Sequence, residues 1–356
     1  MYVTPRPSVS NDPLYALRLA TTGMLAYLAI PLLDPALPPI IAALPVGLIA
    51  AQRKAFNPAK AFGGPLAMIV MAYAMTWLVQ QLRPMPLVYL GAMWLVYFTG
   101  FRMILQSGAQ AGMLIVIVAV LMSVMGMHGN ATVETLRDGF AQASLVALVI
   151  GPLVYFLFPA RTSEQHVDEP VPNTGNVTLG AAIRASVLLG LSFWLYSVMQ
   201  PSDMMMAVIA AMVLVFPTRA AVFFEARQRI HATLHGSAVA LATLWLFMWS
   251  PHLPILLGLV FLGGLWFGHM MLHGRQPSMV YQYAFSVALA LIAGALSTQE
   301  AGYATFTRIV LTLAGAFAAA FAVALLDALS GWQRANQTPT PRAVAVDMVL
   351  FDDNVD

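Results

Sequence analysis

The sequence predicts an all-α polytopic membrane protein with about twelve transmembrane helices in two parallel six-helix repeats. Three observations predict this fold class: 60% of the 356 residues are hydrophobic, only 9% are charged, and apolar stretches of bilayer length recur along the chain. Soluble domains carry about a quarter charged residues, which excludes a soluble enzyme, a disordered regulator and a basic nucleic-acid binder. The formal net charge of +2 predicts no attraction to nucleic acid. Because cysteine is absent, disulfides and cysteine-based metal sites are excluded.

The apolar stretches have about the length that a bilayer core requires, about 20 residues per helix. We expect twelve spans, at 14–33, 36–51, 62–80, 86–103, 110–127, 137–159, 179–199, 204–217, 232–249, 253–272, 278–297 and 303–327. The polar N-terminal segment is followed by an apolar stretch too long for a signal-peptide core, so we expect it to stay in the mature protein.

The distribution of basic residues predicts the orientation. With the N-terminus in the cytoplasm, twelve of the 17 Lys and Arg residues fall on the inside and only Arg83 falls in an outer loop. The other four lie within the spans or at their ends. The positive-inside rule therefore predicts a multi-pass protein of the bacterial inner membrane, with both termini in the cytoplasm and very short outer loops.

The sequence pattern indicates two copies of one six-helix unit. Six spans precede a polar linker, after which Arg184 repeats the position of Arg18, and Arg308 that of Arg137. Chance likeness between apolar helices is the alternative, but the matched arginines favour a duplication. With an even number of spans in each unit, the halves are parallel and a pathway lies between them. The expected parts are an N-terminal segment 1–13, a first repeat 14–160, a cytoplasmic linker 161–178, a second repeat 179–328 and an acidic tail 329–356.

Four arginines are the main candidates for substrate contacts. Arg18, Arg184, Arg137 and Arg308 recur as two matched pairs within the spans. A single arginine near a helix end reaches water by snorkelling, which is the simpler interpretation of each one alone. Because planar guanidinium groups suit carboxylates, their duplication predicts that the four line or gate a path for organic anions.

Carboxylates and prolines near the outer face are further candidates. Asp34 and Asp203 are predicted proton or gating groups, and capping of a loop is the alternative for each. Pro45 and Pro217 are predicted helix breaks near the path, and ordinary turn punctuation is the alternative. The sequence contains no phosphate-binding loop, triad or redox motif, so we expect no enzymatic activity, no cofactor and no metal site.

The segment that enters the ninth span carries a family motif. The duplicated six-helix unit resembles the fusaric acid resistance and aromatic acid exporter family, which is distantly similar to aluminium-activated malate channels. That family often shows an Arg, then Gly-Thr, then Gly at this point, and Arg229, Thr233 and Gly236 match it with Ala232 in place of the first Gly. Arg137 and Arg308 also match an Arg that is typical near the start of the sixth helix of the unit. The first-half counterpart at 60–64 keeps glycines but loses the Thr.

The resemblance covers about residues 14–328 and implies a function. It implies an efflux transporter of small organic anions, plausibly aromatic carboxylic acids, driven by the proton gradient and working with a separate periplasmic adaptor. A homo-oligomer is also compatible with it, although the large cytoplasmic domains of many members are reduced here to the linker and the tail. A passive anion channel and a non-transporting membrane scaffold are the alternatives.

Overall fold

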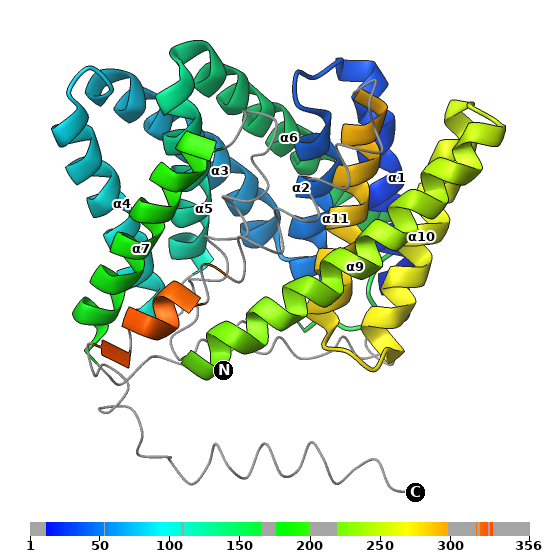
Figure 1. Ribbon diagram of the computed structural model, residues 1–356. Coiled ribbons are helices and arrows are strands. Elements are labelled where there is room, and N and C mark those ends of the chain that lie inside the picture. Colours follow the sequence, from blue (N-terminus) through cyan, green and yellow to red (C-terminus); the bar gives the residue numbers. More distant parts are fainter. Residues whose placement is uncertain are drawn as a thin grey trace, which may run out of the picture.

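A computed structural model describes residues 12–52, 54–107, 110–164, 176–198, 219–297, 318, 321–326 and 328–329. The described parts are almost entirely helical (Figure 1). The helices are α1 (Tyr15–Leu33), α2 (Pro38–Ala51), α3 (Pro58–Leu82), α4 (Pro86–Ser107), α5 (Gln110–His128), α6 (Asn130–Leu157), α7 (Val177–Val198), α9 (Arg219–Trp249), α10 (Leu253–His273) and α11 (Ser278–Ser297). Ten predicted spans coincide with these helices, whereas 204–217 lies outside the described residues and 303–327 lies largely outside them.

Within the described ranges, nine helices are long and apolar enough to cross a membrane, and α2 is shorter. Their starts follow local chemistry. Pro38, Pro58 and Pro86 open α2, α3 and α4, where the missing N–H of proline leaves no hydrogen bond unmade. Asn57 and Asn176 cap α3 and α7, because the side-chain oxygen of each accepts a hydrogen bond from a first-turn N–H at 3.2 Å.

Two helices extend well beyond the predicted apolar spans. α6 begins at Asn130 rather than 137, and α9 begins at Arg219 rather than 232. With 31 residues, α9 rises about 46 Å, which exceeds the bilayer core of about 30 Å. Hydropathy marks the bilayer boundary, while the helix itself continues through polar residues that favour helix as well.

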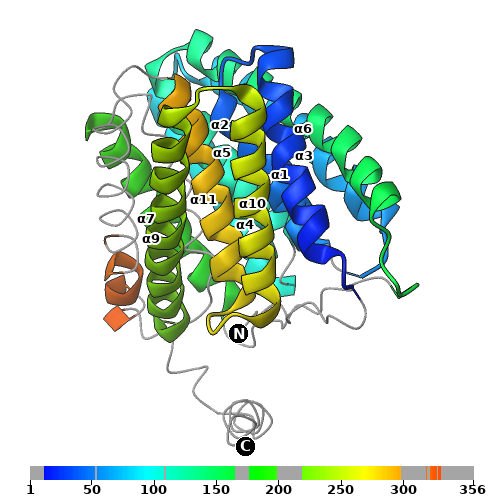
Figure 2. The same ribbon diagram turned by 90° about the vertical axis from the view of Figure 1, so that its right-hand side faces the viewer.

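Helices from the start of the chain pack against helices from later in the chain. α1 packs on α10, and α7 packs on α4, so each pair joins an early helix to a late one. α2 packs on α1, α6 and α11, and α9 packs on α11. Figure 2 shows α9, α11, α10 and α1 side by side along one flank of the bundle. Three core regions result among the described residues: one mainly from α3, α4, α5, α6 and α7, one from α1, α2, α9, α10 and α11, and a smaller one where α1, α2 and α6 meet.

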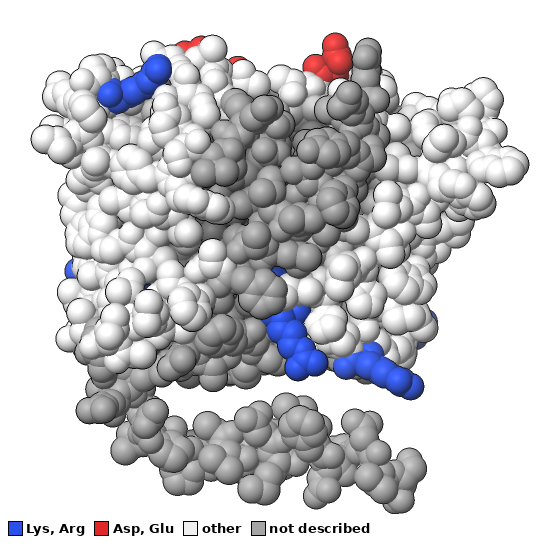
Figure 3. Space-filling model, viewed as in Figure 1, with Lys and Arg blue, Asp and Glu red and all other residues white. Residues whose placement is uncertain are grey.

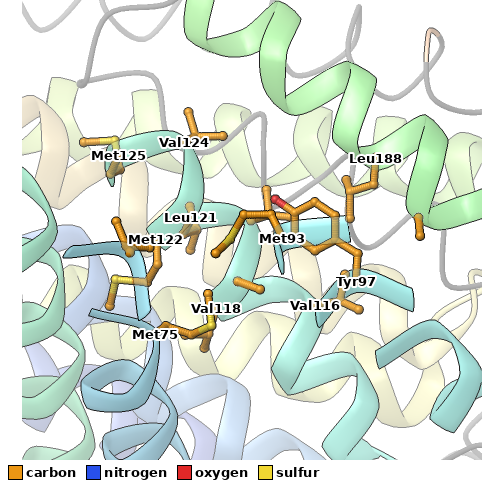
Figure 4. Close-up of a cluster of buried hydrophobic side chains, with 14 of the residues drawn as sticks. Met75, Met93, Tyr97, Val116, Val118, Leu121, Met122, Val124, Met125 and Leu188 are labelled. Carbon is orange, nitrogen blue, oxygen red and sulfur yellow. The ribbon is translucent and has the colours of Figure 1, made fainter. Parts of the chain in front are cut away.

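Methionine and tyrosine fill much of the first core region. Figure 4 shows Met93 beside Tyr97, Met75, Met122 and Met125 farther along the same buried cluster, and Leu188 contributed by α7. Unbranched methionine adapts to gaps between closely packed helices. The outward faces remain strongly apolar: Leu87, Phe156, Met248 and Trp249 are each more than 70% exposed. Such a continuous apolar surface fits lipid rather than water.

The two ends of the bundle differ in charge. On the face in Figure 3, basic side chains gather at the lower end, and acidic side chains with a single basic group lie at the upper end. Arg275 follows α10, and Arg227 and Arg229 lie in the N-terminal half of α9. At the opposite ends of helices, Arg83 donates to Asn130, and Gln80 donates to Glu134. The charge therefore changes along the bundle axis.

Candidate functional site

Arg18 lies at the centre of a buried polar cluster at the start of α1. Its side chain is 1% exposed, and Nη2 forms a short ion pair with Asp12, which is also 1% exposed. Nη1 donates to the carbonyl oxygen of Phe158 at 3.0 Å, and the guanidinium lies 4.3 Å from the ring centre of Tyr155. The cluster thus joins the start of α1 to the end of α6.

Three buried polar atoms of this region have no hydrogen-bond partner among the described residues. They are Asp12 Oδ1, Arg18 Nε and Gln52 Oε1. Gln52 belongs to the same region because its carbonyl oxygen accepts from the Tyr155 hydroxyl at 3.0 Å. Burial raises the pKa of the Asp12 carboxyl and outweighs the lowering effects of Arg18 and of the Lys54 backbone.

Arg184 takes a comparable position on α7. Its side chain is 0% exposed, and Nη1 donates to the carbonyl oxygen of Gly180 at 3.1 Å. Arg18 and Arg184 are the two largest fully buried side chains among the described residues. Both are on helices that pack against the opposite half of the chain, while the contacts of Arg18 described above lie within the first half.

Arg137 lies at the other end of α6 from the Arg18 cluster. Its side chain is 24% exposed, forms an ion pair with Asp138 at 2.8 Å and lies 5.1 Å from the ring centre of Tyr73. Tyr155 follows 18 residues later on α6, which corresponds to about 27 Å. The structure therefore does not bring Arg137 and Arg18 together. Arg308 lies outside the described residues.

Of the predicted carboxylate and proline sites, Asp34 and Pro45 lie within the described residues. Asp34 is exposed and forms the left-handed C-cap of α1 (φ 43°), where its N–H donates to the carbonyl of Ile30. α2 runs without interruption through Pro45, so this proline lies within a helix and not at a break. Asp203 and Pro217 lie outside the described residues.

The family motif lies on one face of α9, against α11. The Arg229 guanidinium lies 3.1 Å from the ring centre of Tyr283, and Thr233 is buried. A Cβ atom at Gly236 would overlap the carbonyl oxygen of Ala284. The motif residues therefore fix the close packing of two helices, a role that the sequence did not assign to them.

Two polar groups of the bundle interior were missed by the sequence analysis. Asp12 precedes the first span and reads as part of a polar terminus. The signal for it was an acid six residues before a membrane-embedded arginine, which needs a counter-ion. The second group is a hydroxyl cluster in which Tyr97 hydrogen-bonds Ser123 at 2.5 Å and Ser192 at 3.3 Å, joining α4, α5 and α7.

Comparison with known protein families gives a match to part of the second half of the chain. Residues 191–322 match the family described as fusaric acid resistance protein-like, and this match includes Arg229, Thr233 and Gly236. No curated protein and no solved structure matches the chain. The likeness to malate channels stays a prediction. The predicted resemblance to the fusaric acid resistance family is confirmed, and the chain is a multi-pass membrane protein that carries a fusaric acid resistance protein-like region.

Proposed function

We propose that this protein is an inner-membrane efflux transporter of small organic anions, with aromatic carboxylic acids as the substrate class and the proton gradient as the driving force. One observation carries the proposal: Arg18 and Arg184 are fully buried on helices that contact the opposite half. Burying a guanidinium inside a membrane protein has a high free-energy cost, so such residues usually serve substrate or ion pathways. The family match supports transport as the general activity.

The packing pattern supports two repeats, at 14–160 and 179–328. If α7 corresponds to α1 and α10 to α4, the α1–α10 and α7–α4 contacts are the same contact made twice. The α3–α5 and α9–α11 contacts correspond in the same way, as do the α4–α5 and α10–α11 contacts. Halves that exchange helices in this manner create equivalent junctions, and each junction involves a helix that carries one of the two buried arginines.

The charged ends support the proposed orientation. The basic end would face the cytoplasm, together with both termini, according to the positive-inside rule. At the other end, the connections between consecutive helices are short: 34–37, 83–85, 129 and 250–252. These short connections form little extracytoplasmic structure. A separate periplasmic adaptor that carries the substrate onward is compatible with this.

Transport by purified protein tests the proposal. Protein in proteoliposomes is expected to move 4-hydroxybenzoate and fusaric acid against their gradients when a pH gradient is imposed. R184Q should abolish this transport while the variant still inserts into the membrane, because the amide removes the charge that attracts the anion. R102Q is the matched control, since Arg102 is an exposed cation at the end of α4.

The outcomes separate the alternatives. Uphill transport that requires the pH gradient supports the exporter. Downhill anion current without coupling would identify a passive channel, and the absence of any flux would favour a scaffold. Full transport by R184Q would remove Arg184 from the pathway.

A further inference from the structure

We propose that Asp12 is an internal counter-ion that competes with the carboxylate of the transported anion for Arg18, so that a proton on Asp12 frees Arg18 for the substrate. This inference rests on the proposed function. It assigns the pH dependence of anion binding to a carboxylate that lies outside the predicted gating pair Asp34 and Asp203. Because the proton and the anion bind together in this exchange, it is a step distinct from the counter-movement of protons that drives the proposed export. In the described structure, the protein's own acid occupies the arginine.

The geometry of the pair carries the inference. Asp12 and Arg18 are both 1% exposed, and one carboxylate oxygen contacts Nη2. The second carboxylate oxygen, Oδ1, and the Nε of Arg18 have no partner in the described part of the chain. A guanidinium binds a carboxylate most strongly through two parallel hydrogen bonds. Asp12 makes one of these contacts here, so the pair falls short of the best arrangement that Arg18 offers to an incoming carboxylate.

Within the described ranges, Asp12 is the acidic side chain that pairs with Arg18. From α6, Tyr155 stacks on Arg18, and on α1 itself Tyr15 donates to the carbonyl of Ala50 at 3.1 Å. α2 contributes no titratable side chain. Of the loop that follows, Lys54 forms an ion pair with exposed Glu164 at 2.9 Å. On α10, His269 and His273 are exposed and stack on each other, with 4.7 Å between ring centres.

The charges balance in each step of the exchange. With Asp12 ionised, its single negative charge neutralises Arg18. When a proton binds Asp12, the carboxyl becomes neutral, and the substrate carboxylate supplies the negative charge beside Arg18. Loss of the proton restores the internal pair and displaces the anion. The raised pKa of the buried Asp12 carboxyl brings protonation closer to the physiological range.

Proton uptake by the unmodified protein tests the exchange. Purified wild-type protein in weakly buffered detergent solution is mixed with 4-hydroxybenzoate, and the proton concentration and the bound radiolabel are both measured. Above the pKa of Asp12, each bound anion should take up a proton, and the affinity should fall about tenfold per pH unit. Binding without proton uptake would overturn the inference, whether or not any variant folds.

Variants assign the proton to Asp12. D12N should bind 4-hydroxybenzoate without proton uptake and with an affinity that does not change with pH. D12N/R18Q, which removes both charges, should lose at least tenfold in affinity relative to D12N. E164Q is the control and should keep the wild-type pH profile, because Glu164 is exposed and pairs with Lys54. A wild-type pH profile in D12N, or unchanged affinity in the double variant, contradicts the inference alone. If wild-type protein binds no anion, the proposed function itself fails, and the inference fails with it.

Discussion

Arg18 shows how the chain tolerates a charge in its membrane-embedded core. The carboxylate of Asp12, the carbonyl of Phe158 and the ring of Tyr155 surround its guanidinium. Burial disfavours the ionised carboxylate of Asp12 more than the neighbouring Arg18 favours it. Stability at this position therefore depends on the protonation state of Asp12.

The pH dependence of unfolding provides a test at the residue scale. Burial raises the pKa of folded Asp12, so between the usual aspartate pKa and the raised value the folded protein binds more protons than the unfolded chain. The contribution of Asp12 to stability is therefore greatest at low pH and falls as the pH rises through the raised pKa. Thermal unfolding midpoints over a pH series should show this slope in wild-type protein and not in D12N.

Glu164 serves as the internal comparison for that test. The neighbouring Lys54 lowers the pKa of this exposed carboxyl, so its contribution has the opposite sign and is lost as the pH falls. E164Q should retain the Asp12 slope. If the slope persists in D12N, another group is responsible for it.

Gly236 gives a second test at the residue scale. A methyl group there would overlap the carbonyl oxygen of Ala284, so G236A should separate α9 from α11 and lower the free energy of unfolding by about 1–3 kcal/mol. G258A is the matched control on α10, since its Cβ would meet no atom within 4 Å. Thermal unfolding in detergent should show a lower midpoint for G236A only. Equal midpoints for the two variants would mean that the α9–α11 contact is looser than described.

Only part of the site could be predicted from the sequence. The recurrence of Arg18 and Arg184 was enough to single them out, because charges in apolar spans are rare. Asp12 was missed because its partner is recognised by spatial contact, and nothing in the local composition separates it from a solvated terminal acid. The packing role of Gly236 likewise depends on Ala284, which is distant in sequence.

At the element scale, small residues decide which helices approach closely. Gly264 and Gly268 on α10 face Ala20 and Ala16 on α1: a Cβ added at Gly264 would lie 2.6 Å from the Cα of Ala20, and one at Gly268 would lie 2.7 Å from that of Ala16. Such small-residue spacings let backbones touch in membranes, where packing replaces the hydrophobic effect as the main attraction. The α1–α10 junction between the two halves depends on this contact.

Cross-linking tests the α1–α10 junction. Because the natural chain has no cysteine, A20C/G264C introduces the only two thiols. An added Cβ at 264 lies 3.1 Å from that of Ala20, below the usual disulfide range of about 3.5–4.5 Å, so a small separation of the two helices should let mild oxidation in membranes join the thiols and block maleimide labelling until a reductant is added. A20C/G190C is the control, since a Cβ at Gly190 meets no atom within 4 Å. Labelling of A20C/G264C that persists after oxidation would contradict the described junction.

At the scale of the whole molecule, the apolar flanks and the unequal charge of the ends predict one orientation in the inner membrane. S163C follows α6 at the basic end, and H252C lies between α9 and α10 at the other end. A membrane-impermeant maleimide added to intact cells should label H252C and should label S163C only after the membrane is opened. The reverse pattern would invert the proposed topology and place the buried Arg18 cluster at the outer face.

The sequence by itself determined the membrane class and most helix positions, and it singled out Arg18 and Arg184 as candidate site residues. This was possible because hydropathy and rare charges are properties of short segments. The tertiary structure decided which early and late helices pack together, that Asp12 pairs with Arg18, and that α9 continues beyond its apolar span. These features depend on contacts such as Arg18 with Tyr155 and Gly268 with Ala16, whose partners are more than a hundred residues apart. The composition of a segment determines whether it prefers lipid or water. Which helix it packs against depends on the shape and charge of side chains that come into contact only when the chain has folded.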